Sequence, residues 1–268
     1  MTAAGLHVVS AELPAGDAPN EDRVRVGKNA VVVLDGASGS DTRVTVADYV
    51  DHLAGALIEV LDAEPDIPLP HALADAIRST VATLRLMPGE SPSSTVSIAR
   101  RRDDEIDLLV LGDSPIYLGP DGELLTDDRL ACLDLPSRTK AYERLRQGAG
   151  YDDVHRELVR RVRAEQLPLL NEPGGYWIAE ARPEAASEAV TRTVPAELPW
   201  LVMLTDGVDK PIRHLSIPLS DLAHRTRDEL DDLLRELHEW EQNKDPTALE
   251  LPRFKQHDDK TAAVVGLV

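Results

Sequence analysis

Short apolar runs separated by polar turns dominate the pattern of this chain. Residues 30–34, 106–111 and 201–205 are rich in Val, Leu and Ile, which is typical of buried strands. Shorter or alternating stretches predict further strands at residues 6–11, 24–26, 93–99, 115–118, 123–125, 176–179, 189–194 and 261–268. We therefore expect an extensive β-sheet core.

Three other stretches carry apolar residues at three- and four-residue spacing, which predicts helices. The first covers residues 42–62, the second starts at 69 or 71 and ends at 86, and the third covers 220–240. Residues 127–173 differ from the rest because they are rich in Arg, Glu and Asp. One helix is expected there, over 151–166, and the whole stretch is interpreted as an excursion from the sheet.

The order of these elements predicts the fold class. Strands come in blocks and helices do not alternate with single strands, which favours a layered α+β architecture over a doubly wound parallel sheet. No internal repeat, low-complexity linker or clear boundary divides the sequence. Residues 1–268 are therefore expected to form a single domain.

Acidic residues stand where several predicted strands end or begin. Asp35-Gly36 and Asp206-Gly207 close two strands, Gly112-Asp113 closes a third, and Asp258-Asp259 precedes the last one. A lone Asp-Gly pair is more often a plain turn, so the interpretation depends on the whole set. Carboxylates gathered by one sheet repel one another and stay ionised only around a cation. The pattern predicts a divalent-cation site.

The composition of the chain disfavours some classes of binding partner. Hydrophobic residues make up 42 % of the chain, as in globular proteins, and 48 acidic against 29 basic residues give a net charge of −19. Such a charge disfavours nucleic acid and anionic membranes as partners. The single cysteine, Cys132, cannot form an intrachain disulfide and fits a reducing cytoplasm. Neither a secretory signal nor an apolar run of about 18 residues is present. The oligomeric state stays open.

Six sequence pieces in order resemble the type 2C, or PPM-type, metal-dependent protein serine/threonine phosphatases of bacteria. The resemblance spans nearly the whole chain and is carried by Asn20-Glu21-Asp22, Asp35-Gly36, Ser93-Ser94-Thr95-Val96, Gly112-Asp113-Ser114, Thr205-Asp206-Gly207 and Asp258-Asp259-Lys260-Thr261. It implies a four-layer α-β-β-α sandwich in which antiparallel helix pairs flank two antiparallel sheets. It also implies hydrolysis of phosphoserine or phosphothreonine on a phosphoprotein.

The resemblance implies two Mg²⁺ or Mn²⁺ ions with a third, weaker site. By this likeness Asp35 bridges both ions, and a water between them attacks phosphorus. The implied ligand set is Asp35, Gly36, Asp206, Asp258, Glu21, Asp22 and Asp113, with Asp35, Asp206 and Asp258 acting in catalysis through metal-bound water. Asp258 is favoured over Asp259, although the pair also suits a cap on the turn into the last strand.

The sequence departs from the family pattern at the phosphate-binding part. Asp17 stands where an Arg is usual, Pro115 replaces another Arg, and Lys210 stands where a third-site ligand is expected. No His follows Asp35-Gly36 as a general acid. The alternative function is therefore that of a catalytically weak or silent binding module. Hydrolysis of small phosphate esters is a third candidate function.

Two further interpretations concern basic side chains. Arg129, Arg138 and Arg144 of the excursion are candidates for a replacement phosphate clamp, by charge and location alone. The histidines show no zinc-binding spacing such as His-Glu-x-x-His. His257, beside Asp258, is interpreted as a packing residue.

Overall fold

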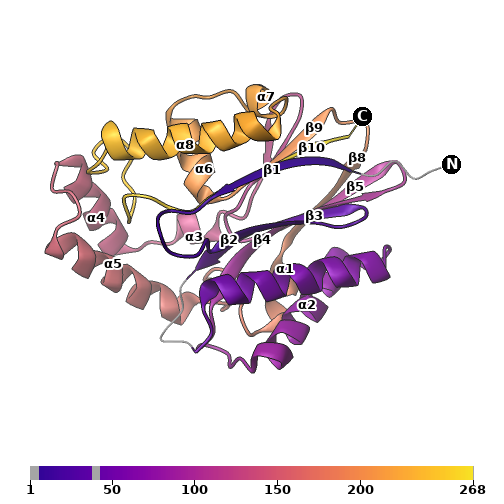
Figure 1. The fold of residues 1–268 in the computed structure, drawn as a ribbon. Coiled ribbons are helices and arrows are strands. Elements are labelled where there is room, and N and C mark those ends of the chain that lie inside the picture. The colour runs from indigo at the N-terminus through magenta and orange to yellow at the C-terminus, as the bar shows by residue number, and fades with distance from the viewer. Residues whose placement is uncertain (1–5, 38–42, 268) are drawn as a thin grey trace.

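Two antiparallel five-stranded sheets form the centre of the molecule in the computed structural model, which describes residues 6–37 and 43–267 (Figure 1). The first sheet has the order β1 (His7–Leu13), β10 (Lys260–Gly266), β9 (Trp200–Leu204), β6 (Ile116–Leu118) and β7 (Glu123–Leu125). The second has the order β2 (Asp22–Val26), β3 (Ala30–Ala37), β4 (Ser93–Arg102), β5 (Glu105–Leu111) and β8 (Val190–Pro195).

Strand β3 shows why the central strands are apolar at every position. Val31 and Val33 belong to the core between the two sheets, whereas Val32 and Leu34 pack toward the helices on the outer face. Successive side chains of a strand point to opposite faces. A strand covered on both faces is therefore a continuous apolar run, as in residues 30–34 of the sequence.

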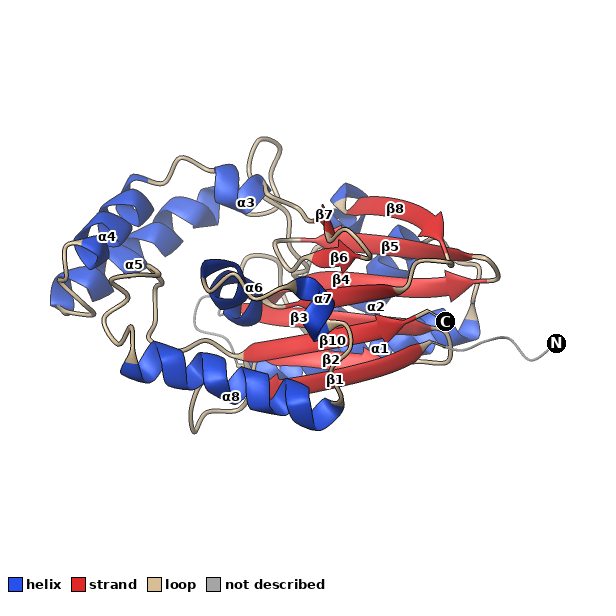
Figure 2. Cartoon of the chain, turned by 90° about the horizontal axis from the view of Figure 1, so that it is seen from above, coloured by secondary structure: helices blue, strands red, loops and turns tan. Residues whose placement is uncertain are grey.

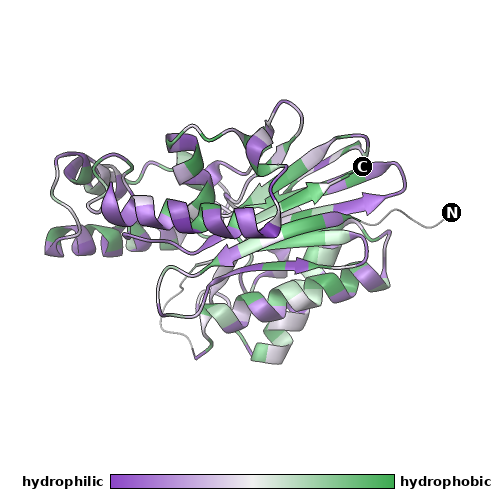
Figure 3. Cartoon of the chain, turned by 45° about the horizontal axis from the view of Figure 1, so that its top comes forward, coloured by the Kyte–Doolittle hydropathy of each residue, from purple (hydrophilic) through white to green (hydrophobic). Residues whose placement is uncertain are grey.

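Helices cover the outer face of each sheet. Helices α1 (Val46–Ala63) and α2 (Leu69–Leu84) pack together over the second sheet. Helix α8 (Arg227–Asn243), with the shorter α6 (Asp206–His214) and α7 (Leu219–Leu222), covers the first. Figure 3 shows strands that are mainly hydrophobic beneath an α8 whose visible face is hydrophilic. The predicted α+β sandwich is confirmed.

Residues 127–173 lie beyond one end of the sheets. Helices α3 (Arg129–Cys132), α4 (Pro136–Arg146) and α5 (Asp153–Gln166) project from that end, and α4 packs on α5 (Figure 2). Short 3₁₀ turns follow at Leu167–Leu169 and Pro183–Glu188. The excursion and its helix over 151–166 are thus present. Helix α4 escaped prediction because only three of its residues are buried.

Two predicted elements differ from the structure, and a further helix was not predicted. The strand expected over 176–179 is only a pair of isolated bridges, Ser94 with Ala179 and Leu170 with Tyr176. Helix α6 was not expected, because Asp206-Gly207 resembles a turn and Pro211 lies inside the helix. Helix α8 begins at Arg227, where Thr226 and Glu229 form a capping box. Among the described residues no helix is both long and apolar enough to cross a membrane.

Candidate metal centre

Carboxylates from both sheets come together at the end nearest the excursion. Asp22 begins β2 and is the register partner of Asp35 on β3. Asp206 follows β9 and opens α6, while Asp258 precedes β10 by two positions. The Thr205 hydroxyl donates to Asp22 Oδ2 at 2.7 Å and joins the two sheets at this end. The connection places strand ends that are distant in sequence beside one another.

The mutual repulsion of these carboxylates is visible at Asp35. Burial raises the pKa of Asp35 well above its usual range, and the charges of Asp22, Asp206, Asp258 and Asp113 raise it further. All four acidic neighbours were predicted from the sequence. These four carboxylates therefore lie near enough to Asp35 for their charges to act on it.

The other members show the same two influences. Burial raises the pKa of Asp22 despite the Thr205 hydrogen bond, with Asp258 adding to the effect. Burial and then Asp206 raise the pKa of Asp113. Burial and then Asp206 raise the pKa of Asp258 to about 6, although Lys255 opposes the shift. An ion among these groups would offset the repulsion that raises their pKa values.

Two lysines lie inside the same cluster. Lys210 forms an ion pair with Asp206, one helical turn away on α6, and Lys255 Nζ lies 2.6 Å from Asp258 Oδ1. Burial would raise the pKa of Asp206, yet Lys210 lowers it below its usual value. The lysine side chains are 46 % and 54 % exposed, so both can withdraw into solvent. The protein thus supplies two positive charges of its own to the cluster.

Asp258 and Asp259 have different roles. Asp259 is buried, and its two carboxylate oxygens accept from the backbone N–H groups of Ala15 and Glu21, each at 2.7 Å. It thereby holds the 15–21 loop. The Glu21 carbonyl in turn accepts from the Gly36 N–H at 3.0 Å. In the described chain the Asp258 carboxylate makes an ion pair only with Lys255. Of the two residues, Asp258 is therefore the one available to the carboxylate cluster.

Close packing explains the glycine after Asp35. A Cβ atom on Gly36 would lie 2.5 Å from the Glu21 carbonyl oxygen, so a larger residue would push the loop away. Burial raises the pKa of Glu21, while Lys255 opposes the shift. The main chain on either side of Asp35 is therefore fixed closely to Glu21.

Strand β4 supports Asp35 from its other side. Asp35 N–H donates to Thr95 Oγ1 at 3.2 Å, and the Ser94 hydroxyl donates to the Asp35 carbonyl at 3.0 Å. Both side chains are buried. Their hydrogen bonds give them a positioning role, as expected for a packed strand without a nucleophilic serine.

The donor set fits a hard divalent ion in type and charge. Mg²⁺ and Mn²⁺ prefer oxygen ligands, and the predicted residues offer carboxylate and carbonyl oxygens. Within the described chain, however, three ligand atoms lie within 4.8 Å of one another only at His238, Glu241 and His257. The carboxylates of the cluster would have to close further around an ion, with the two lysines displaced.

A pocket of about 230 Å³ adjoins this cluster. Asp206 and Asp258 lie in its wall with Lys210 and Lys255, and helix α5 contributes Arg163. Arg163 is exposed, and its guanidinium has no ion-pair partner in the part of the chain that the structure describes. The pocket combines carboxylates with basic groups that can hold an anion.

The arginines first considered as a phosphate clamp have local partners instead. Arg129 pairs with Asp127, and Arg144 pairs with Asp152 at 2.6 Å. Arg138 donates to the carbonyl groups of Leu130, Ala131 and Leu133 and so caps the end of α3. None of the three lines the pocket. That expectation is wrong because charge and location alone do not show where a side chain is engaged.

The remaining departures from the pattern lie as follows. Asp17 is exposed in the loop after β1. Asp209, the acidic residue one position before Lys210, accepts from the Tyr117 hydroxyl at 2.5 Å and is thereby held by the first sheet. Ser38 and Gly39, in the altered loop after Asp35, lie outside the described residues.

No protein-family model matches the sequence, and no curated protein matches it significantly. Solved structures do match. The catalytic domain of the serine/threonine protein phosphatase PstP, in complex with two manganese ions, superposes with a TM-score of 0.53 at 19 % identity and 97 % coverage of both chains. The chain has the fold of the PPM-type serine/threonine phosphatases.

Two further structures of the PPM-type fold extend this likeness. The PPM Ser-Thr phosphatase MsPP from Mycobacterium smegmatis gives a TM-score of 0.55 at 17 % identity, covering 99 % of this chain and 100 % of that one. Stp1 from Staphylococcus aureus gives 0.60 at 13 % identity, covering 98 % and 95 %. The likeness covers the whole length of each chain at low sequence identity.

The sequence alone placed Lys210 at the third-site position but did not indicate its ion pair, and it did not single out Lys255 or Arg163. Lys210 stands four residues after Asp206, a spacing that would have indicated an ion pair had α6 been predicted. On α5, Val159, Val162, Arg163 and Gln166 all line the pocket and follow a helical period. That period was the available signal for Arg163.

Proposed function

We propose that this protein is a metal-dependent phosphatase that hydrolyses phosphoserine or phosphothreonine on proteins, using Mg²⁺ or Mn²⁺. The observation that carries the proposal is the convergence of Asp35, Asp206 and Asp258 from both sheets of a PPM-type fold. The PstP structure of the same fold contains two manganese ions. The proposal here is two ions, with a third, weaker site.

The proposed ligands follow from the positions of the side chains. The charges of Asp22, Asp206, Asp258 and Asp113 all act on Asp35, which supports the proposal that Asp35 contacts both ions. The remaining proposed ligands are Glu21, Asp22, Asp113, Asp206, Asp258 and the carbonyl oxygen of Gly36. Asp113 and Asp206 together are proposed to hold the third ion. When bound, such ions supply a water of lowered pKa and neutralise charge on the phosphoryl oxygens.

The residues of the chain perform the remaining tasks. Thr205 orients Asp22 by its hydrogen bond, and Thr95 holds the backbone of Asp35. Arg163, which lines the same pocket as Asp206 and Asp258, is proposed to hold the substrate phosphate. Guanidinium groups recognise phosphate by charge-assisted hydrogen bonds. Arg163 would thus perform the task of the Arg that Asp17 replaces.

Hydrolysis of p-nitrophenyl phosphate in the presence of Mn²⁺ tests the activity. We expect release of p-nitrophenol that requires the metal and is abolished by Asp35→Asn. Asp121→Asn, in an exposed turn between β6 and β7, is the matched control and should retain full activity. Activity that survives chelation, or Asp35→Asn with wild-type rates, would contradict the proposal.

A substrate panel separates a protein phosphatase from a hydrolase of small esters. We expect phosphoserine and phosphothreonine peptides to be cleaved with higher kcat/KM than free phosphoamino acids and nucleotides. A preference for the small esters would retain the chemistry and change the substrate class.

A non-catalytic binding function is the second candidate, and one observation favours it. Lys210 and Lys255 already neutralise Asp206 and Asp258 without an ion. Absence of hydrolysis across pH, Mg²⁺ and Mn²⁺, together with retained binding of a phosphopeptide, would support this function.

We also propose a cytoplasmic location and a single domain over 1–268 in which residues 127–173 form an insertion. The location rests on the lone cysteine, Cys132, which is exposed and unpaired. The insertion carries Arg163 and forms one wall of the pocket, so it belongs with the site and not with a separate unit.

A further inference from the structure

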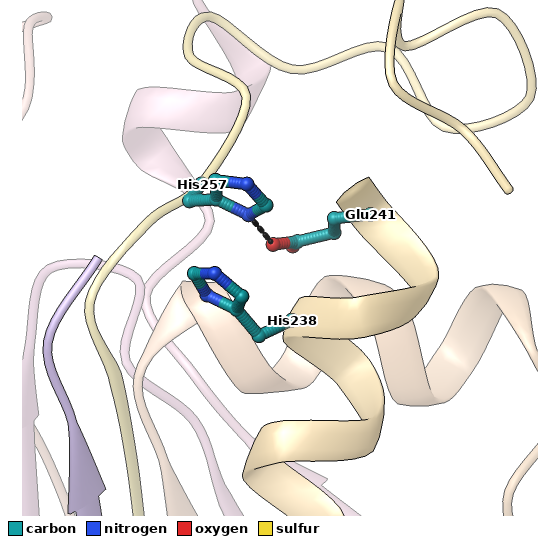
Figure 4. A group of neighbouring side chains, drawn as sticks. All are labelled: His238, Glu241 and His257. Atoms are coloured by element: carbon teal, nitrogen blue, oxygen red, sulfur yellow. Dashed lines mark hydrogen bonds and ion pairs between the residues drawn. The ribbon is translucent and has the colours of Figure 1, made fainter. Parts of the chain in front are cut away.

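Two histidines and a glutamate lie together between helix α8 and the segment that leads into β10 (Figure 4). His238 and Glu241 stand three positions apart on α8 and therefore share one face of that helix. His257 comes from the segment that leads into β10. One ligand atom from each residue lies within 4.8 Å of the others. Tertiary contact thus assembles a set of nitrogen and oxygen donors.

The distances within the group suit a shared ion. His257 Nδ1 lies 3.0 Å from Glu241 Oε2. Two ligands of a tetrahedral zinc ion, each about 2.0–2.2 Å from the metal, lie roughly 3.4 Å apart. The rings of His238 and His257 stack with centroids 3.8 Å apart and planes inclined by 12°. Because the nitrogen lone pairs lie in the ring planes, one imidazole would have to rotate out of the stack to bring the three ligand atoms to one ion.

One nitrogen in the group lacks a partner. His238 Nδ1 is buried and makes no hydrogen bond in the described structure. Buried polar atoms in folded proteins are nearly always paired. Imidazole nitrogens without a hydrogen bond are the commonest metal ligands among protein side chains, and His238 Nδ1 is available for this role.

The charges around these three residues indicate which class of metal ion they would bind. Glu241 is 1 % exposed, and its Oε2 accepts from Lys260 Nζ at 2.8 Å, with Lys260 itself fully buried. The lysine fixes and neutralises the carboxylate, so the two imidazoles supply most of the binding. Imidazole ligands suit Zn²⁺ and its neighbours in the first transition row, whereas Mg²⁺ prefers oxygen.

We propose that His238, Glu241 and His257 form a binding site for a first-row transition-metal ion, represented by Zn²⁺, separate from the carboxylate cluster. Two histidines and one glutamate with an open fourth position make a known zinc donor set. Because His257 adjoins Asp258, an ion here would hold the start of β10 against α8. The site does not depend on the proposed phosphatase activity.

Titration of the full-length, chelator-treated protein with Co²⁺ tests this site, with millimolar Mg²⁺ present to occupy the carboxylates. We expect visible absorption bands of Co²⁺ bound by nitrogen and oxygen, which Zn²⁺ abolishes by displacement. His238→Ala, His257→Ala and Glu241→Gln should each weaken binding by at least about tenfold, because even outer partners of a metal site contribute 10–100-fold.

Matched controls distinguish the two sites. His224→Ala removes an exposed histidine outside the group and should bind Co²⁺ as the wild type does. Asp35→Asn should abolish phosphatase activity and leave the Co²⁺ bands unchanged. Bands lost in Asp35→Asn and kept in His238→Ala would place the ion among the carboxylates and overturn the proposal.

The wild-type protein provides a measurement that does not depend on folding of the variants. X-ray absorption at the zinc edge should show two imidazole ligands in the Zn²⁺-loaded protein with Mg²⁺ in excess. A first shell made only of oxygen, or wild-type protein without Co²⁺ bands, would show that the group is a hydrogen-bonded packing cluster.

Discussion

Lys210 and Lys255 form ion pairs with Asp206 and Asp258, two of the proposed metal ligands. Burial alone would lower the pKa of Lys255, but Asp258, Asp35 and Asp206 raise it. A metal ion entering the site has to displace both ammonium groups. At the residue scale, these two lysines therefore compete with the metal.

Removal of either lysine should strengthen metal binding. An exposed ion pair contributes about 0.2–1 kcal/mol, so Lys210→Ala or Lys255→Ala should tighten Mn²⁺ binding by roughly 1.5- to 5-fold. Isothermal titration calorimetry measures the change, and Lys244→Ala, an exposed lysine after α8, is the control. Weaker Mn²⁺ binding in both variants would show that the lysines support the site and do not compete.

Arg163 is the residue expected to recognise phosphate. Loss of a charge-assisted hydrogen bond costs about 1.5–3 kcal/mol, so Arg163→Ala should raise KM for a phosphopeptide by roughly 10- to 100-fold. The value of kcat should change less, because the group binds substrate and transition state alike. Arg161→Ala, two positions away and paired with Glu157, is the control. An unchanged KM would remove Arg163 from the site.

The strand pair β4–β5 contains a buried ion-pair group far from the carboxylate cluster. Asp107 accepts from Arg100, Arg102 and Thr193, which joins β4, β5 and the edge strand β8. Burial would raise the pKa of Asp107, but the hydrogen bonds from Arg102, Arg100 and Thr193 lower it to about 2. At the element scale, this carboxylate fixes three neighbouring strands.

Asp107→Asn should lower the free energy of unfolding by about 3 kcal/mol, because it leaves the buried Arg100 without its charge partner. The folded pKa lies below the ordinary value of 3.8, so the stabilisation is present above that pH and is lost as the pH falls toward 2. Urea unfolding at pH 7 and at pH 3 measures both effects. Asp104→Asn, in the exposed β4–β5 turn, should change neither.

The whole molecule should gain stability from metal binding. Without an ion, the carboxylates of two sheets repel one another across the end of the sandwich. Mn²⁺ at 100 times its dissociation constant stabilises the folded state by about 2.7 kcal/mol per site, or roughly 5–10 °C in melting temperature for a chain of this size. Differential scanning fluorimetry with and without Mn²⁺ measures the shift, which Asp35→Asn should remove.

The pH dependence of this shift follows from Asp258. Its folded pKa of about 6 lies above the ordinary value of 3.8. Between these pH values the metal-free folded state binds one proton that the unfolded chain has lost, so the folded state loses stability as the pH rises from 3.8 to 6. An ion must displace that proton below pH 6. The stabilisation by Mn²⁺ should therefore be largest above pH 7 and shrink as the pH falls through 6. A constant shift from pH 5 to 8 would contradict a role for Asp258 as a ligand.

The sequence by itself determined the layered α+β fold and the carboxylates that lie at its strand ends. Strand and helix periodicity is a local property, because burial of one or both faces imposes it on each segment. Residues 30–34 therefore predicted most of β3, which continues through Asp35 to Ala37, and Asp206 was placed just after a strand before any contact was known. The helix α6 after Asp206 was missed because its Asp-Gly start and Pro211 resemble a turn.

Only the tertiary structure decided which side chains meet. Contacts between distant segments depend on how the sheets and helices stack, and one-dimensional spacing does not contain that information. Two backbone N–H groups donate to Asp259 and give it a different role from Asp258. Arg163 lines the pocket, whereas Arg138 does not. The meeting of His257 with His238 was equally invisible in the sequence, because α8 and the β10 segment are brought together only by packing on the sheet.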